Sequence, residues 1–184
     1  MIVLIIPVFN EEKKIKDVIN SIRGYCDQII VINDGSTDRS KDILESIEDP
    51  RLIYVDQQNL GLPFSLNKAI GMSQGNFIAR MDADDISHSE RLEKQFNYLN
   101  KNQNIDLVGS CIRVMNEQGE IIGSKSVPLE NRIIQESIDY ACNVMHPTYF
   151  FRKEIHQTAG GYRDQFIYAQ DYDFLLRIRD LGKG

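Results

Sequence analysis

An acidic cluster that directly follows an apolar run most constrains how this chain can fold. The run is residues 77–81 (FIARM), and the cluster is residues 82–85 (DADD). This order is typical of a buried strand that stops at the surface, and in open α/β sheets ligands bind beyond the carboxyl ends of the strands. We therefore predict an α/β protein with a binding site where this strand ends.

The acidic cluster is predicted to hold a metal ion. Asp82, Asp84 and Asp85 repel one another in water, and a divalent cation removes that repulsion. Mg²⁺ and Mn²⁺ take oxygen ligands and usually share them with substrate phosphates, so a diphosphate is the expected partner of the metal. The alternative is structural: Asp84 and Asp85 would lead into and cap a helix that starts near Ser89.

Strand-like and helix-like segments alternate over the first 105 residues. Apolar runs at residues 1–9, 28–33, 52–56 and 77–81 predict buried strands, and short loops join them to the helices. This alternation requires a mainly parallel sheet that is covered by helices on both faces. The first helix should have Asn10 as its N-cap and Ile15, Val18, Ile19 and Ile22 facing inward, and further helices are expected after residue 38, around 65–72 and over 91–100.

The pattern changes after residue 106. Residues 107–115 and 121–127 flank a turn and predict a β-hairpin. A polar helix over 129–138, a strand over 148–151 and a helix over 171–181 follow, the last capped by Gly182. We predict one domain over residues 1–184, with a nucleotide-binding half at about 1–105 and a mixed-sheet half at about 106–184 that faces the second substrate.

Composition excludes several classes of function. The net charge is −6 and no basic tract exceeds two residues, which argues against nucleic acid as the main partner. The three cysteines are far apart and odd in number, which suits buried thiols in a reducing compartment. The apolar start lacks the features of a signal peptide, and no stretch approaches the roughly 20 apolar residues that span a bilayer. We expect a cytoplasmic chain, soluble or at most peripheral to a membrane.

Carboxylates follow two of the predicted parallel strands and should share one cleft. Asp34 follows the second strand, while Asp82 and Asp84 follow the fourth. The chain has neither a P-loop nor a G-x-G-x-x-G motif, so a cation is required if a diphosphate binds at this acidic edge. Asp34 can accept the imide N–H of a uracil ring, a contact that adenine cannot offer. Its alternative role is to form a turn with Gly35.

A second acidic segment begins the last predicted helix. The helix dipole favours an ionised carboxylate at Asp171, which suits a general base that takes a proton from an attacking hydroxyl. The alternative is an N-cap, and Asp173 is either a second candidate base or a solvated residue. His146 is interpreted as an unliganded structural histidine, and His88 and His156 as surface residues.

Five motifs, in this order, resemble those of the large inverting glycosyltransferase family 2. Each motif is weak alone, but five in order at suitable spacings form a specific signal that covers essentially the whole chain. The resemblance implies the GT-A fold, a Rossmann-like, mixed and mainly parallel sheet flanked by helices. The motifs are residues 7–12 (PVFNEE), 33–38 (NDGSTD), 59–61 (NLG), 82–85 (DADD) and 170–173 (QDYD).

The resemblance also implies residue roles. Asp34 would bind uracil, and Asp171 would be the catalytic base. Asp82 and Asp84 would form the Mn²⁺ or Mg²⁺ site, with Asp82 toward the ribose and the metal waters and Asp84 as the direct ligand. The other implied nucleotide-binding residues are Pro7, Val8, Phe9 near the base, Asn10, Glu12, Asn59, Gly61 and Asn67.

Two features depart from the family pattern. Gln170 stands where the family has a glutamate, which affects acceptor contacts more than catalysis because Asp171 is kept. Family members usually continue beyond the helix that ends near residue 181. We therefore expect a C-terminally short acceptor half that lacks a lid or acceptor-binding element, with impaired activity.

The predicted function is metal-dependent, inverting transfer of a sugar from a nucleotide-diphosphate sugar to an acceptor hydroxyl. A UDP-sugar is the expected donor, and the expected acceptor is a saccharide or lipid-linked molecule in surface-glycan biosynthesis at the inner face of the cell membrane. One alternative is a domain that binds UDP without turnover. Another is a haloacid-dehalogenase-like phosphatase, but that family expects its D-x-D motif at the first strand, and here the motif follows the fourth.

Overall fold

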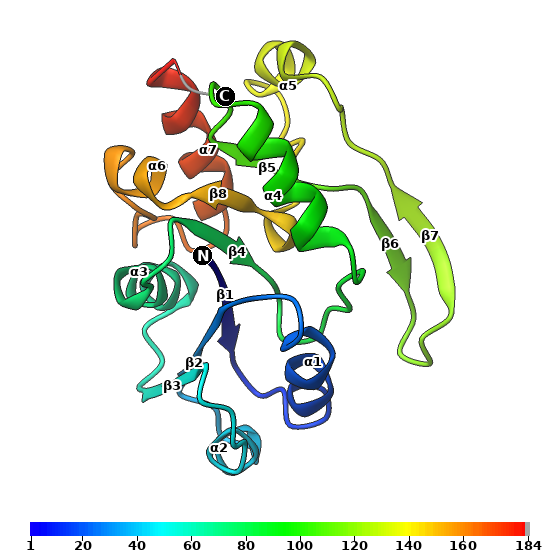
Figure 1. Cartoon of the computed structure of the whole chain (residues 1–184), viewed down its shortest axis with the longest axis vertical. Helices are drawn as coiled ribbons and strands as arrows, with labels where there is room; N and C mark the ends of the chain where they lie inside the picture. Colours follow the sequence, from blue (N-terminus) through cyan, green and yellow to red (C-terminus); the bar gives the residue numbers. More distant parts are fainter. Residues whose placement is uncertain (183–184) are drawn as a thin grey trace.

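A central sheet with helices on both faces organises residues 1–182, the part of the chain that this computed structural model describes (Figure 1). The sheet has the strand order β3-β2-β1-β4-β8-β5, and β6 and β7 form a separate hairpin. The strands are β1 (Ile2–Val8), β2 (Gln28–Asp34), β3 (Leu52–Gln57), β4 (Phe77–Arg80), β5 (Leu107–Val108), β6 (Ile112–Met115), β7 (Ile121–Lys125) and β8 (Phe150–Arg152).

The helices are α1 (Ile15–Ile22), α2 (Ser40–Glu45), α3 (Leu62–Met72), α4 (Arg91–Lys101), α5 (Asn131–Ser137), α6 (Lys153–Thr158) and α7 (Gln170–Asp180), with a 3₁₀ turn, η1, at His146–Thr148. None of these helices is both long and apolar enough to cross a membrane. The four residues predicted to face inward from the first helix are all buried, which confirms the helical stripe.

The first four strands are parallel, as predicted. β1 pairs with β2 and β4, and β2 pairs with β3. All seven residues of β2 are buried, because helices cover both faces of the sheet and leave no solvated side. β8 runs antiparallel to its neighbours β4 and β5, which makes the sheet mixed. The predicted α/β class with a mainly parallel mixed sheet is therefore confirmed.

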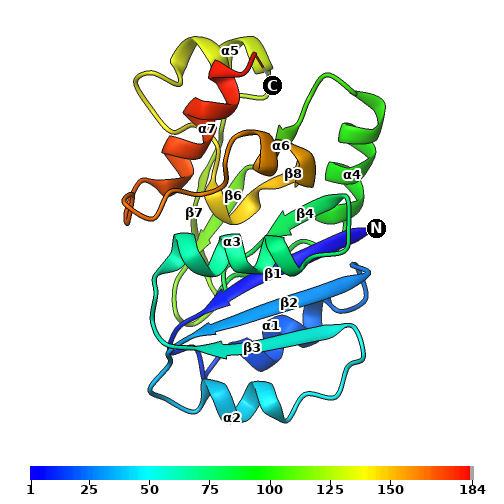
Figure 2. The ribbon, with the colours of Figure 1, turned by 90° about the vertical axis from the view of Figure 1, so that its left-hand side faces the viewer.

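Two apolar layers hold the helices against the sheet. Alternate residues of β1 point to opposite faces, so that Val3 and Ile5 belong to one layer and Leu4 and Ile6 to the other. The first layer includes side chains of α3, α6 and α7, and the second includes side chains of α1, α2 and α4. Figure 2 shows α3 in front of the sheet and α1 behind it, with the arrowheads of β1, β2 and β3 pointing to the same side.

Three local predictions were wrong. Asn10 is not the N-cap of α1, since Lys14 precedes the helix and Asn10 adopts a φ of 57°. The strand expected over residues 107–115 divides into β5 and β6, because the Ser110 N–H donates to Thr148 Oγ1 at 2.9 Å instead of to a neighbouring strand. The strand expected over 148–151 begins only at Phe150, after η1, and helix α6 was not predicted.

The hairpin of β6 and β7 lies apart from the central sheet, to the right of α4 in the view of Figure 1. Every residue of β7 is exposed, and α5 contributes no buried residue. The hairpin prediction is confirmed. The two core layers thus lie in the central sheet and its helices, and this region positions the site.

Candidate active site

A cavity of about 300 Å³ opens where the parallel strands end. Because β1, β2 and β4 are adjacent and parallel, the residues that follow them meet at one edge of the sheet. The structure therefore brings together eight of the residues predicted from the sequence. The cavity is lined by Pro7, Val8, Phe9, Glu11, Asp34, Asn59, Gly61, Leu62, Asp82, Ala83 and Asp84.

Asp34 fixes the loop on one side of this cavity. Its Oδ1 accepts hydrogen bonds from Gln57 Nε2 at 2.8 Å and from the Leu60 N–H at 2.9 Å, and its Oδ2 accepts one from the Gly61 N–H at 2.9 Å. A carboxylate has about four acceptor positions. One position on Oδ2 therefore remains for a ligand, so Asp34 can hold the loop and also contact a base.

Gly35 explains how that loop comes so close. Its φ is +77°, and a Cβ at this position would lie 2.6 Å from the backbone nitrogen of Asn59. The close approach of the two segments places Asn59 and Gly61 in the cavity wall. Only a residue without a side chain allows this contact without a shift of the backbone.

The acidic cluster divides into one paired and one free carboxylate. Arg80, which is 3% exposed, donates from Nη1 to Asp82 Oδ2 at 3.1 Å and from Nη2 to Asp82 Oδ1. Asp84 is exposed, and its carboxylate has no hydrogen bond or ion pair within residues 1–182. Burial raises the pKa of Asp82, Asp84 adds to this shift, and Arg80 opposes it.

The capping role of Asp84 and Asp85 is not supported. Helix α4 begins at Arg91, its N-cap position is Glu90, and no side chain caps it. Asp85 is half-buried, and burial raises its pKa, with Asp82 and Asp84 adding to the shift. The three carboxylates thus stay close to one another, as the metal hypothesis requires.

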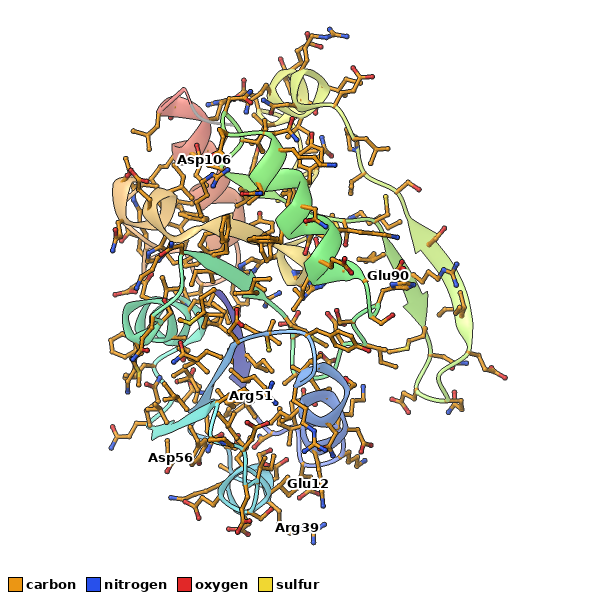
Figure 3. The ribbon with its side chains drawn as sticks, in the orientation of Figure 1. Glu12, Arg39, Arg51, Asp56, Glu90 and Asp106 are labelled. Carbon is orange, nitrogen blue, oxygen red and sulfur yellow. The ribbon has the colours of Figure 1, made fainter. Side chains whose placement is uncertain are left out.

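Glu11 is a cavity residue that the sequence analysis did not select. Burial raises its pKa, and Asp84 and Asp82 contribute to the shift, so the three carboxylates lie within electrostatic reach of one another. The adjacent Glu12 was predicted instead, but its Oε2 accepts a hydrogen bond from the Arg39 N–H at 3.0 Å and it does not line the cavity (Figure 3). The signal that could have identified Glu11 is its position, because it lies one residue nearer to the end of β1 than Glu12 does.

Asn10 also lies outside the cavity lining. Its Oδ1 accepts a hydrogen bond from the Thr37 N–H at 2.7 Å, and its own N–H donates to Ser36 Oγ at 2.9 Å. With Glu12, it ties the loop after β1 to the loop after β2. The two residues therefore support the cavity wall and do not form it.

The cavity fits a cation that is shared with a ligand. No group of three His, Cys, Asp or Glu side chains within residues 1–182 is arranged to hold a metal ion by itself. However, Asp84 presents free carboxylate oxygens to the cavity, and Glu11 and Asp82 lie close to it. Mg²⁺ and Mn²⁺ commonly take one or two carboxylates and complete their coordination with water and substrate phosphates. The donor set matches that mode of binding.

Asp171 does not line this cavity. It is the second residue of α7, and it is partly buried. Its Oδ2 lies 3.7 Å from the Cys142 thiol, and its carbonyl oxygen lies 3.5 Å from the Tyr149 hydroxyl. The N-cap alternative is not supported, because Ala169 occupies that position and no side chain caps the helix.

Asp173 is neither solvated nor free to act as a base. Its Oδ2 accepts from Arg177 Nη2 at 2.7 Å, and its Oδ1 lies 3.4 Å from Arg163 Nη1. Arg177 also donates to the carbonyl oxygens of Ala159 and Gly161, at 2.6 Å for Gly161. This arrangement fastens α7 to the loop that precedes it.

The two remaining histidines of interest are structural. His146 is buried, its Nε2 lies 3.1 Å from the Tyr162 hydroxyl, and burial lowers its pKa well below the usual value. The surface position predicted for His156 is wrong, since this residue is only 9% exposed and burial lowers its pKa to about 4. Its Nε2 lies 2.9 Å from Asn67 Oδ1.

The position of Asn67 does not support its predicted contact with a nucleotide. Its amide donates to the Tyr162 carbonyl at 2.7 Å and accepts from the Tyr162 N–H at 2.8 Å. It lines a second cavity of about 450 Å³, between α3 and α6, which shares no residue with the cavity at the sheet edge. The larger cavity holds no carboxylate, so we place the candidate active site at the smaller one.

Comparison with known proteins identifies the family of this chain. The model of the family named Glycosyl transferase family 2 matches residues 3–160. The O-antigen biosynthesis glycosyltransferase WbnJ of Escherichia coli is 34% identical over 97% of this chain and 71% of its own length. An uncharacterized glycosyltransferase of Methanocaldococcus jannaschii is 32% identical over 96% of this chain and 64% of its own length.

Solved structures share the fold. S. aureus TarS, residues 1–349, has a TM-score of 0.73 at 21% identity, and the match covers 96% of this chain and 54% of TarS. The mannosyltransferase PcManGT of Pyrobaculum calidifontis, solved with GDP-Man and Mn²⁺, has a TM-score of 0.74 at 19% identity over 99% and 52% of the two chains. The present chain therefore spans about half of these solved chains, and it has the GT-A fold. The chain belongs to glycosyltransferase family 2.

Proposed function

We propose that this chain catalyses metal-dependent, inverting transfer of a sugar from a UDP-sugar to an acceptor hydroxyl. One observation carries the proposal: Phe9, Asp34 and Asp84, which lie at or beyond the ends of three separate parallel strands, line one cavity at the carboxyl edge of the sheet. In this proposal residues 1–105 form the donor half and residues 106–184 the acceptor half.

The donor half would bind the nucleotide through groups that the cavity presents. Phe9 is 49% exposed and offers a ring face on which a base can stack. The free acceptor position on Asp34 Oδ2 suits the imide N–H of uracil. Asp84, with Glu11 and Asp82 beside it, would hold Mn²⁺ or Mg²⁺. The bound cation would neutralise the charge that develops on the leaving diphosphate.

Asp171 would act on the acceptor. Its carboxylate would take the proton from the acceptor hydroxyl as that oxygen attacks the anomeric carbon. The bond from the anomeric carbon to the diphosphate breaks in the same displacement, on the opposite face, so the configuration inverts. The Cys142 thiol, 3.7 Å from Asp171 Oδ2, and the Tyr149 hydroxyl, 3.5 Å from the Asp171 carbonyl oxygen, would help to position this residue.

The relatives support a role in surface-glycan assembly. WbnJ is named for O-antigen biosynthesis, and AmsE of Erwinia amylovora, 30% identical over 99% of this chain, is named for amylovoran biosynthesis. S. aureus TarS has been solved with UDP and with UDP-GlcNAc. We therefore propose a saccharide or lipid-linked acceptor and a place at the cytoplasmic face of the membrane. The phosphatase alternative is not favoured, because the chain matches glycosyltransferase family 2 and its acidic motif follows the fourth strand.

A thermal-shift panel tests the proposal. UDP, UDP-sugars, GDP-mannose and inorganic phosphate are compared with and without Mn²⁺, because a ligand that binds the folded state raises its melting temperature. We expect a rise with UDP or a UDP-sugar that requires Mn²⁺, followed by release of UDP from the matching sugar donor. A rise without turnover would identify a binding domain, and the absence of any Mn²⁺-dependent rise would refute the proposal.

A further inference from the structure

We propose that Arg80 is a positioning residue. By bonding to both carboxylate oxygens of Asp82, it keeps Asp82 from ligating the cation directly, so that Asp84 is the direct ligand. This inference rests on the proposed function, because it concerns the division of labour within the acidic motif. Arg80 stood in the sequence as one charged residue inside an apolar run. In the structure, it is the one residue of β4 that reaches the acidic motif by hydrogen bonds from its side chain.

The Arg80 guanidinium grips both oxygens of Asp82. Its two terminal nitrogens bond one oxygen each, the two-pronged geometry in which arginine binds a carboxylate most specifically. Arg80 is 3% exposed, whereas the Asp82 side chain is 36% exposed. The carboxylate is thus held from the protein side, and its remaining acceptor positions still face the cavity.

The backbone of Arg80 is also fixed. Its N–H donates to the Tyr149 carbonyl at 2.8 Å, and its own carbonyl accepts from Arg91 Nη1 and Nη2 at 3.2 and 3.3 Å. Arg91 donates in addition to the Pro147 carbonyl at 2.9 Å. Tyr149, which lies between η1 and β8, and Arg91, the first residue of α4, therefore hold the Arg80 backbone in place, and a rigid support of this kind sets the orientation of Asp82.

Charge explains why this arrangement directs the cation elsewhere. A guanidinium and a divalent cation on the same carboxylate repel each other, so Asp82 is a poor direct ligand as long as Arg80 holds it. Asp84, two residues away, lines the same cavity and has no competing partner within residues 1–182. Asp82 remains able to accept hydrogen bonds from metal-bound water or from a ribose hydroxyl.

The alternative is that Arg80 only stabilises the fold by pairing with a half-buried carboxylate. That structural role predicts no change in Mn²⁺ affinity when Arg80 is substituted. A third role, in which Arg80 orients Asp82 as a metal ligand, predicts a change opposite in sign to the one that we propose. If Asp82 were a metal ligand oriented by Arg80, loss of one of the two Arg80–Asp82 hydrogen bonds would weaken metal affinity, typically by about 10–100-fold. If Arg80 withholds Asp82, the same change frees a carboxylate oxygen and binding becomes tighter.

The experiment measures Mn²⁺ binding directly, from the electron paramagnetic resonance signal of free Mn²⁺ titrated into the full chain with saturating UDP. Arg80→Lys keeps the charge and removes the two-pronged contact. We expect Mn²⁺ to bind about threefold more tightly, while kcat for the UDP-sugar falls by about tenfold or more. In an Asp82→Asn background, Arg80→Lys should leave Mn²⁺ affinity unchanged within a factor of about two.

Arg152→Lys is the matched control. Arg152 is also a poorly exposed arginine of the sheet, but it pairs with Phe77 at the opposite end of β4. The Arg152→Lys variant should change the melting temperature without changing Mn²⁺ affinity. If Arg80→Lys weakens Mn²⁺ binding, or behaves like Arg152→Lys in every measurement, the inference is wrong.

Two single variants decide the matter if Arg80→Lys does not fold. Asp84→Asn should weaken Mn²⁺ binding by about tenfold or more, and Asp82→Asn by less than about threefold. Equal losses would overturn the role of Arg80 and leave the proposed function intact. If the wild-type chain took up no Mn²⁺ with UDP, the proposed function would fail and this inference with it.

Discussion

The sheet edge and the start of α7 bring their acidic residues into place by different means. At the edge, Asp34 ends β2 while Asp82 and Asp84 follow β4, and both strands run parallel to β1 between them, so the topology of the sheet alone gathers the three residues at one cavity. Asp171 stands on a helix whose position depends on side-chain contacts, such as those of Arg177 with the carbonyl oxygens of Ala159 and Gly161. The donor side is therefore built into the sheet, and the proposed acceptor side is packed onto it.

The most direct way to break this comparison is to change one carboxylate on each side. Asp171→Asn should lower kcat by about 10²–10⁴-fold, because it removes the proposed base, while the affinity for UDP with Mn²⁺ stays within about twofold. Asp84→Asn should instead lose Mn²⁺-dependent UDP binding. Calorimetric titration and a UDP-release assay distinguish the two variants. Wild-type activity in either variant would remove the substituted residue from the mechanism.

Loosening α7 should affect the acceptor side alone. Arg177→Met leaves Asp173 without its closest partner at a site where both side chains are nearly buried, and we expect a loss of about 3 kcal/mol in the free energy of unfolding. At temperatures where the variant is folded, kcat should fall more than UDP affinity. Arg179→Met is the control, because Arg179 pairs with exposed carboxylates of Asp139 and Asp180 and should matter little. A matching loss of UDP affinity in Arg177→Met would contradict the separation.

A substitution under the cavity loop tests the donor side by itself. Gly35→Ala places a Cβ 2.6 Å from the Asn59 nitrogen at a φ of +77°, and should cost about 2–3 kcal/mol and weaken UDP binding. Gly119→Ala has a similar φ of +81° but meets no atom within 4 Å, so it should cost about 1 kcal/mol and leave UDP binding unchanged. Chemical denaturation and calorimetry on both variants measure the difference. An identical loss of unfolding free energy in the two variants would show that the close approach of Gly35 to Asn59 is unimportant.

The smallest expected effect concerns pH. Burial disfavours the charged form of His156 and lowers its pKa from the ordinary histidine value of 6.5 to about 4 in the folded state. Unfolding therefore takes up a proton as the pH falls below 6.5, so stability is complete above that pH and declines until about pH 4. At pH 5 the loss from this residue is about 2 kcal/mol. His156→Gln should reduce the difference in stability between pH 7 and pH 5 by that amount, and an unchanged difference would show that the histidine does not contribute.

The sheet and its cavity could be predicted because their determinants are local. Apolar runs specify buried strands, and carboxylates that directly follow those runs must lie at the sheet edge. The choice between Glu11 and Glu12 could not be made in this way. It depends on the left-handed backbone at Asn10, which turns one glutamate to the cavity and the other to Arg39.

Residues whose partners are far away in the sequence were harder to place. Asn67 bonds to Tyr162, 95 residues later, and this contact accounts for its absence from the cavity lining. His156 is buried against the same pair, and no periodic pattern announced α6. The role of Arg80 could not be predicted for a different reason: its partner Asp82 is only two residues away, but nothing in a strand pattern indicates that the two side chains bond.

The antiparallel strand β8 has a consequence for biosynthesis. β4 ends at residue 80, but β8, which pairs with the edge of β4 away from β1, begins only at residue 150. At elongation rates of about 5–20 residues per second, roughly 4–14 s pass before the ribosome delivers the strand that covers Ile78 and Ala79. During that interval the nascent donor half presents an apolar, unpaired strand edge, the kind of surface on which chains associate wrongly. Slower translation of this stretch would lengthen the vulnerable period, and the arrival of Phe150 and Phe151 would end it.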